Sequence, residues 1–148
     1  MKAKKIVINT SDGSYPILIG KNLSLKLGNI LKENNIFSSK ILLVIDNNVP
    51  KKIVQKIKKK IKKKIFVIYI DANEKNKSQK SVDKIIDVLL KNNFNRTDCL
   101  ISIGGGIIGD LSAYVSSIFK RGLFYVNIPT TLLAQVDSSI GGKTGINS

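Results

Sequence analysis

The sequence predicts an α/β fold: a mostly parallel sheet with helices on both faces, preceded by an N-terminal hairpin. Short, fully apolar runs of strand length recur along the chain, and stretches with apolar residues at helical spacing alternate with them. This alternation is typical of a parallel sheet that is covered on both faces. The 148 residues, 43% of them hydrophobic, suffice for one domain with its own core.

The N-terminal part predicts a hairpin and then a helix. Apolar residues 6–8 and 15–19 predict two strands around a turn at residues 11–14. A helix is expected next, because apolar residues then recur at helical spacing: Leu23, Leu27, Ile30 and Leu31.

Four continuous apolar runs predict the strands of the main sheet, at residues 41–45, 65–70, 100–103 and 124–128. Pro50 is predicted as a first helical residue, a position that tolerates proline, and an apolar stripe follows it: Ile53, Val54, Ile57 and Ile61. The next helix is expected to open near Ser78, with one apolar side: Val82, Ile85, Ile86, Leu89 and Leu90. A last helix is expected to follow Gly104 and to run through Phe119.

The formal net charge of +15 suggests nucleic acid as a partner, but the distribution of the charge argues against it. Nine lysines lie within residues 51–64, where they cover the polar face of a predicted helix. Arg96 and Arg121 are the only arginines and aromatic residues make up 6% of the chain, whereas nucleic-acid readers rely on guanidinium groups and aromatic stacking. We interpret the lysines as a solvated helix face; the alternative is a basic nucleic-acid-binding module.

The single cysteine and the hydropathy pattern favour a cytoplasmic protein without a membrane segment. Cys99 lies in an apolar run and has no partner for an internal disulfide, which suits a reducing compartment and a buried structural thiol. The apolar stretch after the basic start is too short for a signal peptide. No apolar run reaches the roughly 20 residues that a membrane span needs.

Polar or glycine-rich residues follow each predicted strand of the main sheet, at positions 46–48, 71–74, 104–106 and 129–131. In parallel sheets, ligands bind at the carboxyl ends of the strands, so a ligand site is expected there. Residues 104–109 also match the pattern G-x-G-x-x-G between a strand and a helix, which lets a backbone approach a pyrophosphate. The alternative is a glycine-rich turn with only a structural role.

Two common nucleotide-binding motifs are disfavoured. The dinucleotide fingerprint normally lies in the first crossover and has an acidic residue about 20 positions later, where this chain has Pro129 and Thr130. The sequence Gly142-Lys143-Thr144 ends like a P-loop, but Asp137 occupies the position of the required first glycine. An ordinary Rossmann dehydrogenase and a nucleotide triphosphatase are therefore poor matches, although Lys143 is still expected to contact an anion or a hydroxyl group.

Residues 104–111, 120–122 and 128–144 together closely resemble the 3-dehydroquinate synthase family. The resemblance covers essentially the whole chain and implies a Rossmann-like, NAD-binding domain over residues 1–148. Enzymes of this family convert a seven-carbon sugar-acid phosphate, 3-deoxy-D-arabino-heptulosonate 7-phosphate, into 3-dehydroquinate and phosphate in the shikimate pathway. They use NAD and a divalent metal, zinc or cobalt. One departure is Ala72-Asn73, which replaces the more usual Asp-Gly before Glu74.

The resemblance implies a role for each matching residue. The cofactor contacts would be Asp46, Asn48, Glu74, Lys77, Gly105, Gly106, Gly109, Asp110, Thr130, Thr131 and Lys143. Arg121 would contact the substrate phosphate, across a dimer interface, while Asp137 and Lys143 would contact the substrate near the transferred hydride.

Several of these residues also have a structural interpretation. Asp46 would cap a turn or helix, Glu74 and Lys77 would form a surface pair, and Gly109 would let the helix pack closely. Arg121 would be a helix-end cation, and Asp137 would cap the turn at residues 138–139.

The resemblance also implies a C-terminal helical domain that supplies a glutamate and two histidines to the metal, and a homodimeric full-length enzyme. This chain stops before that domain and contains no histidine, so we expect it to be inactive by itself. Two related activities stay open: a 2-deoxy-scyllo-inosose synthase, and a metal-dependent alcohol or glycerol dehydrogenase.

Overall fold

The computed structural model describes residues 2–140 and 145–147 and begins with a hairpin. Strands β1 (Lys4–Thr10) and β2 (Gly13–Ile19) pair antiparallel, with Thr10 opposite Gly13. The turn is therefore shorter than predicted, and the φ of +143° at Gly13 is one that residues with a side chain rarely adopt. The predicted hairpin is confirmed, and it forms a separate two-stranded sheet.

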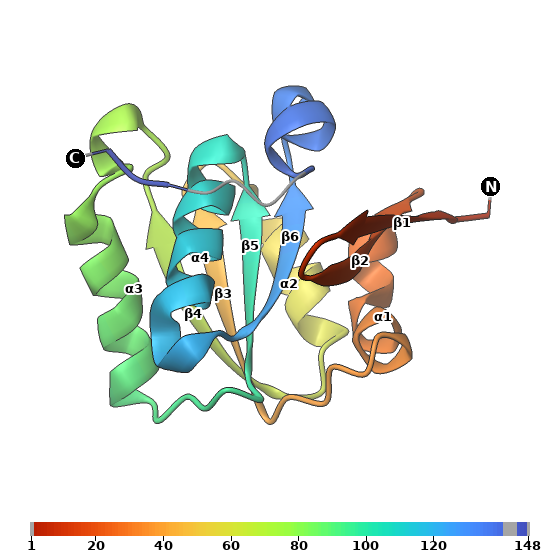
Figure 1. The fold of residues 1–148 in the computed structure, drawn as a ribbon, viewed down its shortest axis with the longest axis horizontal. Helices are drawn as coiled ribbons and strands as arrows, with labels where there is room; N and C mark the ends of the chain where they lie inside the picture. The colour runs from red at the N-terminus through yellow and green to blue at the C-terminus, as the bar shows by residue number, and fades with distance from the viewer. Residues whose placement is uncertain (1, 141–144, 148) are drawn as a thin grey trace.

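The main sheet has four parallel strands in the order β4-β3-β5-β6. They are β3 (Lys40–Asp46), β4 (Lys64–Ile70), β5 (Cys99–Gly104) and β6 (Phe124–Pro129). All four point the same way in Figure 1, so their carboxyl ends meet at one edge. The predicted runs all form strands, and the parallel sheet is confirmed.

Helical segments connect these strands. The longer ones are α1 (Leu27–Glu33), α2 (Lys51–Lys59), α3 (Gln79–Lys91) and α4 (Gly106–Ile118). Short helical turns are η1 (Leu23–Lys26), η2 (Glu74–Asn76), η3 (Phe119–Arg121) and η4 (Ala134–Ser138), the last of which is a π-helix.

Helices cover both faces of the main sheet, as predicted. Alternate residues of β3 belong to two different core clusters, since successive strand side chains point to opposite faces. Leu43 and its neighbours pack with α1 and α2 on one face, whereas Leu42 and its neighbours pack with α3 and α4 on the other (Figure 1). Strands β3 and β5 are buried over almost their whole length, which explains their uninterrupted apolar sequences.

A buried carboxylate ties the starts of the two central strands together. Asp98 is fully buried, and its Oδ1 accepts from the Lys40 backbone amide at 3.0 Å and from the Ser39 hydroxyl at 3.1 Å. Its Oδ2 accepts from the backbone amide of Asn95 at 2.8 Å. The beginning of β3 is thereby held beside the beginning of β5.

Three helix boundaries differ from the prediction. Pro50 is the N-cap of α2 rather than its first helical residue, because its ψ of 130° is extended while its carbonyl accepts from Ile53 and Val54. The predicted helix over residues 23–31 is split at Lys26, whose φ of −104° and ψ of 13° interrupt it. The helix expected to run through Phe119 ends at Ile118.

The lysine-rich segment forms α2 and the loop after it. All nine lysines of residues 51–64 are exposed, while Val54 and Ile57 of the same helix are buried. This arrangement is the one expected for a solvated helix face. None of the helices in the described part of the chain combines the length and the apolar character that a bilayer span requires.

The predicted buried thiol is confirmed at Cys99, which is fully buried in β5. Burial raises the pKa of this thiol to about 12, and the neighbouring Asp98 carboxylate adds to the effect. Since the neutral thiol is much less nucleophilic than the thiolate, Cys99 is a structural residue.

Two adjacent leucines test the packing of α3. Replacing Leu89, which is fully buried, by alanine is expected to lower the free energy of unfolding by about 2–5 kcal/mol, because a cavity remains in the core. The same change at Leu90, which is 54% exposed, is expected to cost about 1 kcal/mol or less. Urea unfolding followed by circular dichroism measures both values. Equal losses would contradict the orientation of α3.

Candidate functional site

The carboxyl ends of β3 and β5 form the centre of the candidate site. The strand order places them side by side, and the chain leaves them toward opposite faces of the sheet, β3 toward α2 and β5 toward α4. Such a switch point is where parallel α/β sheets form a ligand crevice. The glycine motif after β5 therefore lies at the switch point, although it is not in the first crossover.

Gly104 ends β5 where a side chain does not fit. A Cβ atom there would lie 2.8 Å from Ile108 Cγ1 and 3.1 Å from Asp46 Cβ. The missing side chain thus lets the first turn of α4 and the end of β3 approach the same backbone position. Asp46 and the glycine turn are held together as a result.

The loop after β6 lies against the glycine turn. A Cβ atom on Gly105 would be 3.2 Å from Thr131 Cγ2, and one on Gly106 would be 3.2 Å from Ser138 Oγ. The Thr130 amide donates to the Gly104 carbonyl at 2.9 Å, which fixes the start of this loop. Hydroxyl groups from residues distant in sequence are therefore placed beside bare backbone.

Helix α4 begins at this turn with its amides available. Gly105 is the N-cap and has no side chain to accept from the first turn. The free N–H groups and the helix dipole at this end favour a negatively charged group. With Gly105 and Gly106 leaving the backbone bare, this end suits a phosphate or pyrophosphate.

Asp46 forms a local turn and keeps one oxygen available. Its Oδ1 accepts from the backbone amide of Asn48 at 2.9 Å and from the Asn48 side chain at 3.2 Å. Asp46 Oδ1 therefore caps a turn, as the structural interpretation expects. No hydrogen bond to Oδ2 is found within the described residues, so this oxygen is free to accept from a ligand hydroxyl.

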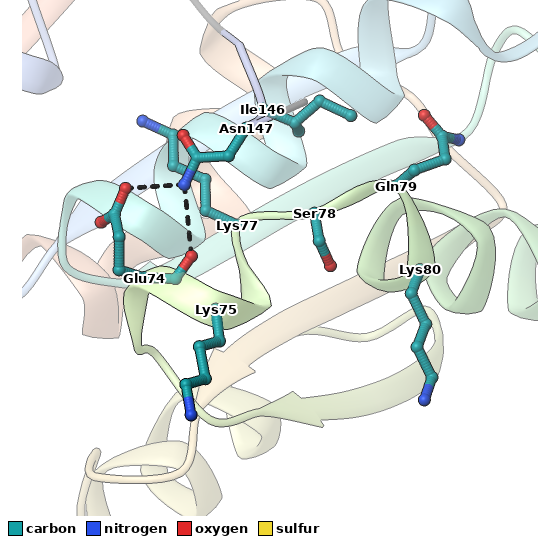
Figure 2. Close-up of a pocket in the computed structure, with 8 residues that line it drawn as sticks. All are labelled: Glu74, Lys75, Lys77, Ser78, Gln79, Lys80, Ile146 and Asn147. Carbon is teal, nitrogen blue, oxygen red and sulfur yellow. Dashed lines mark hydrogen bonds between the residues drawn. The ribbon is translucent and has the colours of Figure 1, made fainter.

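A second polar cluster lies beside the glycine turn, around η2. Lys77 Nζ pairs with Asp110 Oδ2 of α4 at 2.8 Å, and both side chains are partly buried, with exposures of 23% and 20%. Glu74 is instead hydrogen-bonded to Asn147, so these two contacts are present in place of the Glu74–Lys77 surface pair that was the structural alternative. A pocket of about 680 Å³ lies between η2, the start of α3 and residues 146–147 (Figure 2).

A partly buried polar network connects α4 to β5 and β6. Tyr125 of β6 donates from its hydroxyl to the Gly109 carbonyl at 3.0 Å and contacts Ser102 Oγ at 2.9 Å. Ser102 also bonds the Asn127 side chain at 2.8 Å. Burial raises the pKa of Tyr125 well above its usual range, against the lowering effect of the Ser102 bond, and the Asp110 charge raises it further. The hydroxyl thus stays protonated and keeps holding α4.

Gly109 is less constrained than expected from its place in the motif. A Cβ atom there would meet Asn127 at 3.5 Å, an ordinary van der Waals contact. Helix α4 packs against the Asn127 side chain at Gly109, and this packing leaves space for a methyl group.

The structure does not place all three residues that were expected to contact the substrate at the candidate site. Asp137 belongs to the π-helix η4, next to Ser138 and thus beside the glycine turn, and its side chain is exposed. Arg121 lies at the opposite edge of the sheet, in η3 after the far end of α4 (Figure 1). The fold therefore does not bring Arg121 to the rest of the site within one chain. Lys143 lies outside the described residues.

Sequence reasoning missed two polar residues that line the site. Ser138 contacts Gly106, and Asn147 bonds Glu74 across a separation of 73 residues. The π-helix that presents Ser138 has no signal in the apolar spacing, although such helices are frequent at functional sites. Neither contact has a local sequence signature, because each depends on how distant loops meet.

The described residues offer no evident ligand set for a catalytic metal. No group of three or more histidine, cysteine, aspartate or glutamate side chains suited to a metal ion occurs within residues 2–140 and 145–147. The whole sequence contains no histidine. The donors of the described site are instead hydroxyls, amides, carboxylates and a lysine, which suit a dinucleotide better than zinc.

Comparison with known proteins identifies relatives of this chain. A family model described as 3-dehydroquinate synthase N-terminal matches residues 67–148. The 3-dehydroquinate synthase of Pelagibacter ubique (strain HTCC1062) is 55% identical over 145 residues, which cover 97% of this chain and 39% of that protein. The chain thus spans about two fifths of the length of the curated relatives that it matches.

Solved structures share the fold. A 2-deoxy-scyllo-inosose synthase complexed with carbaglucose-6-phosphate, NAD+ and Co2+ superposes with a TM-score of 0.88 at 19% identity, covering 98% of this chain and 40% of that one. A 2-epi-5-epi-valiolone synthase from Streptomyces hygroscopicus subsp. jinggangensis 5008, with NAD+ and Zn2+ bound, gives a TM-score of 0.80 at 26% identity and covers 97% and 40%.

The close approach at Gly104 is directly testable. Gly104→Ala is expected to lower the free energy of unfolding by about 1–3 kcal/mol, because the new methyl group overlaps Ile108 and Asp46. Gly145→Ala is the control, since a Cβ atom there meets nothing within 4 Å. Urea unfolding of both variants measures the difference. An unchanged midpoint for Gly104→Ala would show that the contact is not tight.

Proposed function

The chain belongs to the 3-dehydroquinate synthase family, and from this we propose that it forms the NAD-binding part of such an enzyme. The proposed enzyme is a lyase of aromatic amino-acid biosynthesis, in the shikimate pathway. It converts 3-deoxy-D-arabino-heptulosonate 7-phosphate into 3-dehydroquinate and phosphate. We further propose that it works in the cytoplasm as a homodimer.

One observation carries the proposal: the uncapped start of α4 lies at the switch point with Asp46 on one side and Thr131 on the other. The bare backbone of Gly105 and Gly106 would receive the pyrophosphate of NAD, where amides and the helix dipole favour its charge. The free carboxylate oxygen of Asp46 would accept from ribose hydroxyls, with Asn48 holding the turn.

We propose further cofactor contacts on either side of this turn. Thr131 Oγ1 accepts from the Ala134 amide at 3.2 Å, which leaves its own proton available to donate, and Thr130 stands beside it. We assign both hydroxyls to the nicotinamide end. Glu74 and Lys77 would hold the cofactor from the η2 side, and Asp110 would orient Lys77 through their ion pair.

NAD, when bound, supplies a reversible hydride acceptor that can return its hydride within one turnover. Asp137 would accept hydrogen bonds from substrate hydroxyls at the edge of this cleft, and Lys143 would stabilise developing negative charge. Arg121 would bind the substrate phosphate of another copy, since it lies at the far edge of its own sheet.

A divalent metal, zinc or cobalt, does not fit the described residues of this chain. We propose that its ligands lie in another part of the whole protein and assign no chemical step through the metal to this chain. For the same reason, the 148-residue polypeptide by itself is proposed to be inactive.

Affinity for NAD tests the cofactor assignment. Lys77→Met is expected to weaken NAD binding about tenfold, because a partly buried cation near the pyrophosphate is lost. Lys91→Met is the matched control, because Lys91 is an exposed lysine at the far end of α3, and it should change the affinity less than about twofold. Isothermal titration calorimetry measures both. Wild-type protein without measurable NAD affinity would refute the proposed function.

The proposed reaction is testable in a chimera. This chain replaces the matched 145 residues of the Pelagibacter ubique relative, whose remaining part is kept. With NAD and zinc, the chimera is expected to release phosphate from 3-deoxy-D-arabino-heptulosonate 7-phosphate without accumulating NADH, because the hydride returns in each turnover. Lys143→Met in the chimera is expected to abolish the release, and the 148-residue chain alone is expected to show none.

Three other results would favour the alternative functions. Phosphate release from a hexose 6-phosphate and not from the seven-carbon substrate would favour a 2-deoxy-scyllo-inosose synthase. Accumulation of NADH with a simple alcohol would favour a metal-dependent dehydrogenase. Salt-sensitive binding to DNA without affinity for NAD would favour the basic binding module.

A further inference from the structure

Asn147 makes three hydrogen bonds to the η2 loop. Its side-chain nitrogen donates to Glu74 Oε1 at 2.8 Å and to the Glu74 carbonyl at 3.3 Å. Its backbone amide donates to the Lys77 carbonyl at 2.8 Å, and the residue forms a parallel bridge with Ser78. Figure 2 shows the side chains of Glu74 and Asn147 facing each other at the rim of the pocket. One residue thus fixes both ends of the loop.

The bond to the carboxylate decides how Glu74 is presented. Glu74 is exposed, and a glutamate side chain that is free in solvent samples many rotamers. Among the described residues, Asn147 is the only side chain that is hydrogen-bonded to this carboxylate. With Oε1 occupied by an N–H donor, Oε2 is left as the acceptor for a ligand hydroxyl.

The loop held by Asn147 is also connected to the glycine turn. Lys77, whose carbonyl accepts from Asn147, pairs through its ammonium group with Asp110 on the first turns of α4. A continuous set of contacts therefore runs from residue 147 through η2 to the start of α4.

We propose that Asn147 is a positioning residue that orients the Glu74 carboxylate and holds the η2 loop ready for the cofactor. This inference rests on the proposed NAD site. Holding the loop in its binding geometry beforehand reduces the entropy that is lost when the ligand binds. The amide is essential to this role, because an aspartate at position 147 would place a second carboxylate against Glu74.

The test is a double-mutant cycle between positions 147 and 74, with NAD as the ligand. Asn147→Ala is expected to weaken NAD binding about fivefold, and Asn147→Asp about twentyfold, because repulsion then adds to the lost bond. In the double variant Asn147→Asp with Glu74→Gln, the new amide at position 74 can donate to the new carboxylate at position 147, which restores the bond with reversed polarity. This variant is expected to bind NAD within about threefold of Glu74→Gln alone.

A second measurement does not depend on the cofactor. Without NAD, the backbone amide of residue 147 is expected to exchange its hydrogen faster in Asn147→Asp than in the wild type, and the double variant should recover the protection. Asn92→Ala is the matched control, since it removes an amide-to-carbonyl bond of 2.8 Å at the far end of α3 and should alter neither measurement.

The outcomes separate this inference from the proposed function. If the wild type binds NAD and Asn147→Asp binds it equally well, the positioning role is refuted and the NAD site stands. If the single variants weaken binding but the double variant shows no recovery, the bond to Glu74 is not the cause and the inference also fails. A wild type without NAD affinity overturns both.

Discussion

The close approach of two strand ends is the constraint on which the rest of the site depends. Gly104 has no side chain, so the end of β3 and the first turn of α4 both reach the space that a Cβ atom would fill. Asp98 holds the same two strands together at their starts. Because β3 and β5 are fixed at both edges of the sheet, Asp46 and the glycine turn keep a defined relative position.

The other loops assemble around this centre through polar contacts, in addition to apolar residues such as Ala72 and Ile146 that pack against the core. The loop after β6 reaches the glycine turn with Thr131 and Ser138, and η2 reaches α4 through the Lys77–Asp110 pair. Polar contacts of this kind leave donors and acceptors for a ligand while the buried strands below them carry the stability. Because the strands carry the stability and the loops carry the polar groups, the proposed dinucleotide site can lie at the edge of a rigid sheet.

Much of the fold was predictable because its apolar pattern is strong. The buried strands of the main sheet appear in the sequence as continuous apolar runs, and α3 has one apolar side from Val82 to Leu89. Boundaries that depend on a single dihedral angle were not predictable, as the extended ψ of Pro50 shows. The π-helix over Ala134–Ser138 was missed for a similar reason, since one residue more per turn leaves no periodic signal in five residues.

By itself, the sequence determined the α/β class, the order of the elements, the glycine turn after a strand and the polar residues at the strand ends. Only the tertiary structure decided which of these residues meet: Asp46 with Gly104, Thr131 with Gly105, and Asn147 with Glu74. It also placed Arg121 at the edge of the sheet opposite the glycine turn. The physical reason is the distance in sequence between the interacting residues. Local patterns encode which face of a helix or strand is buried, whereas contacts between loops distant in sequence depend on the order of the strands in the sheet.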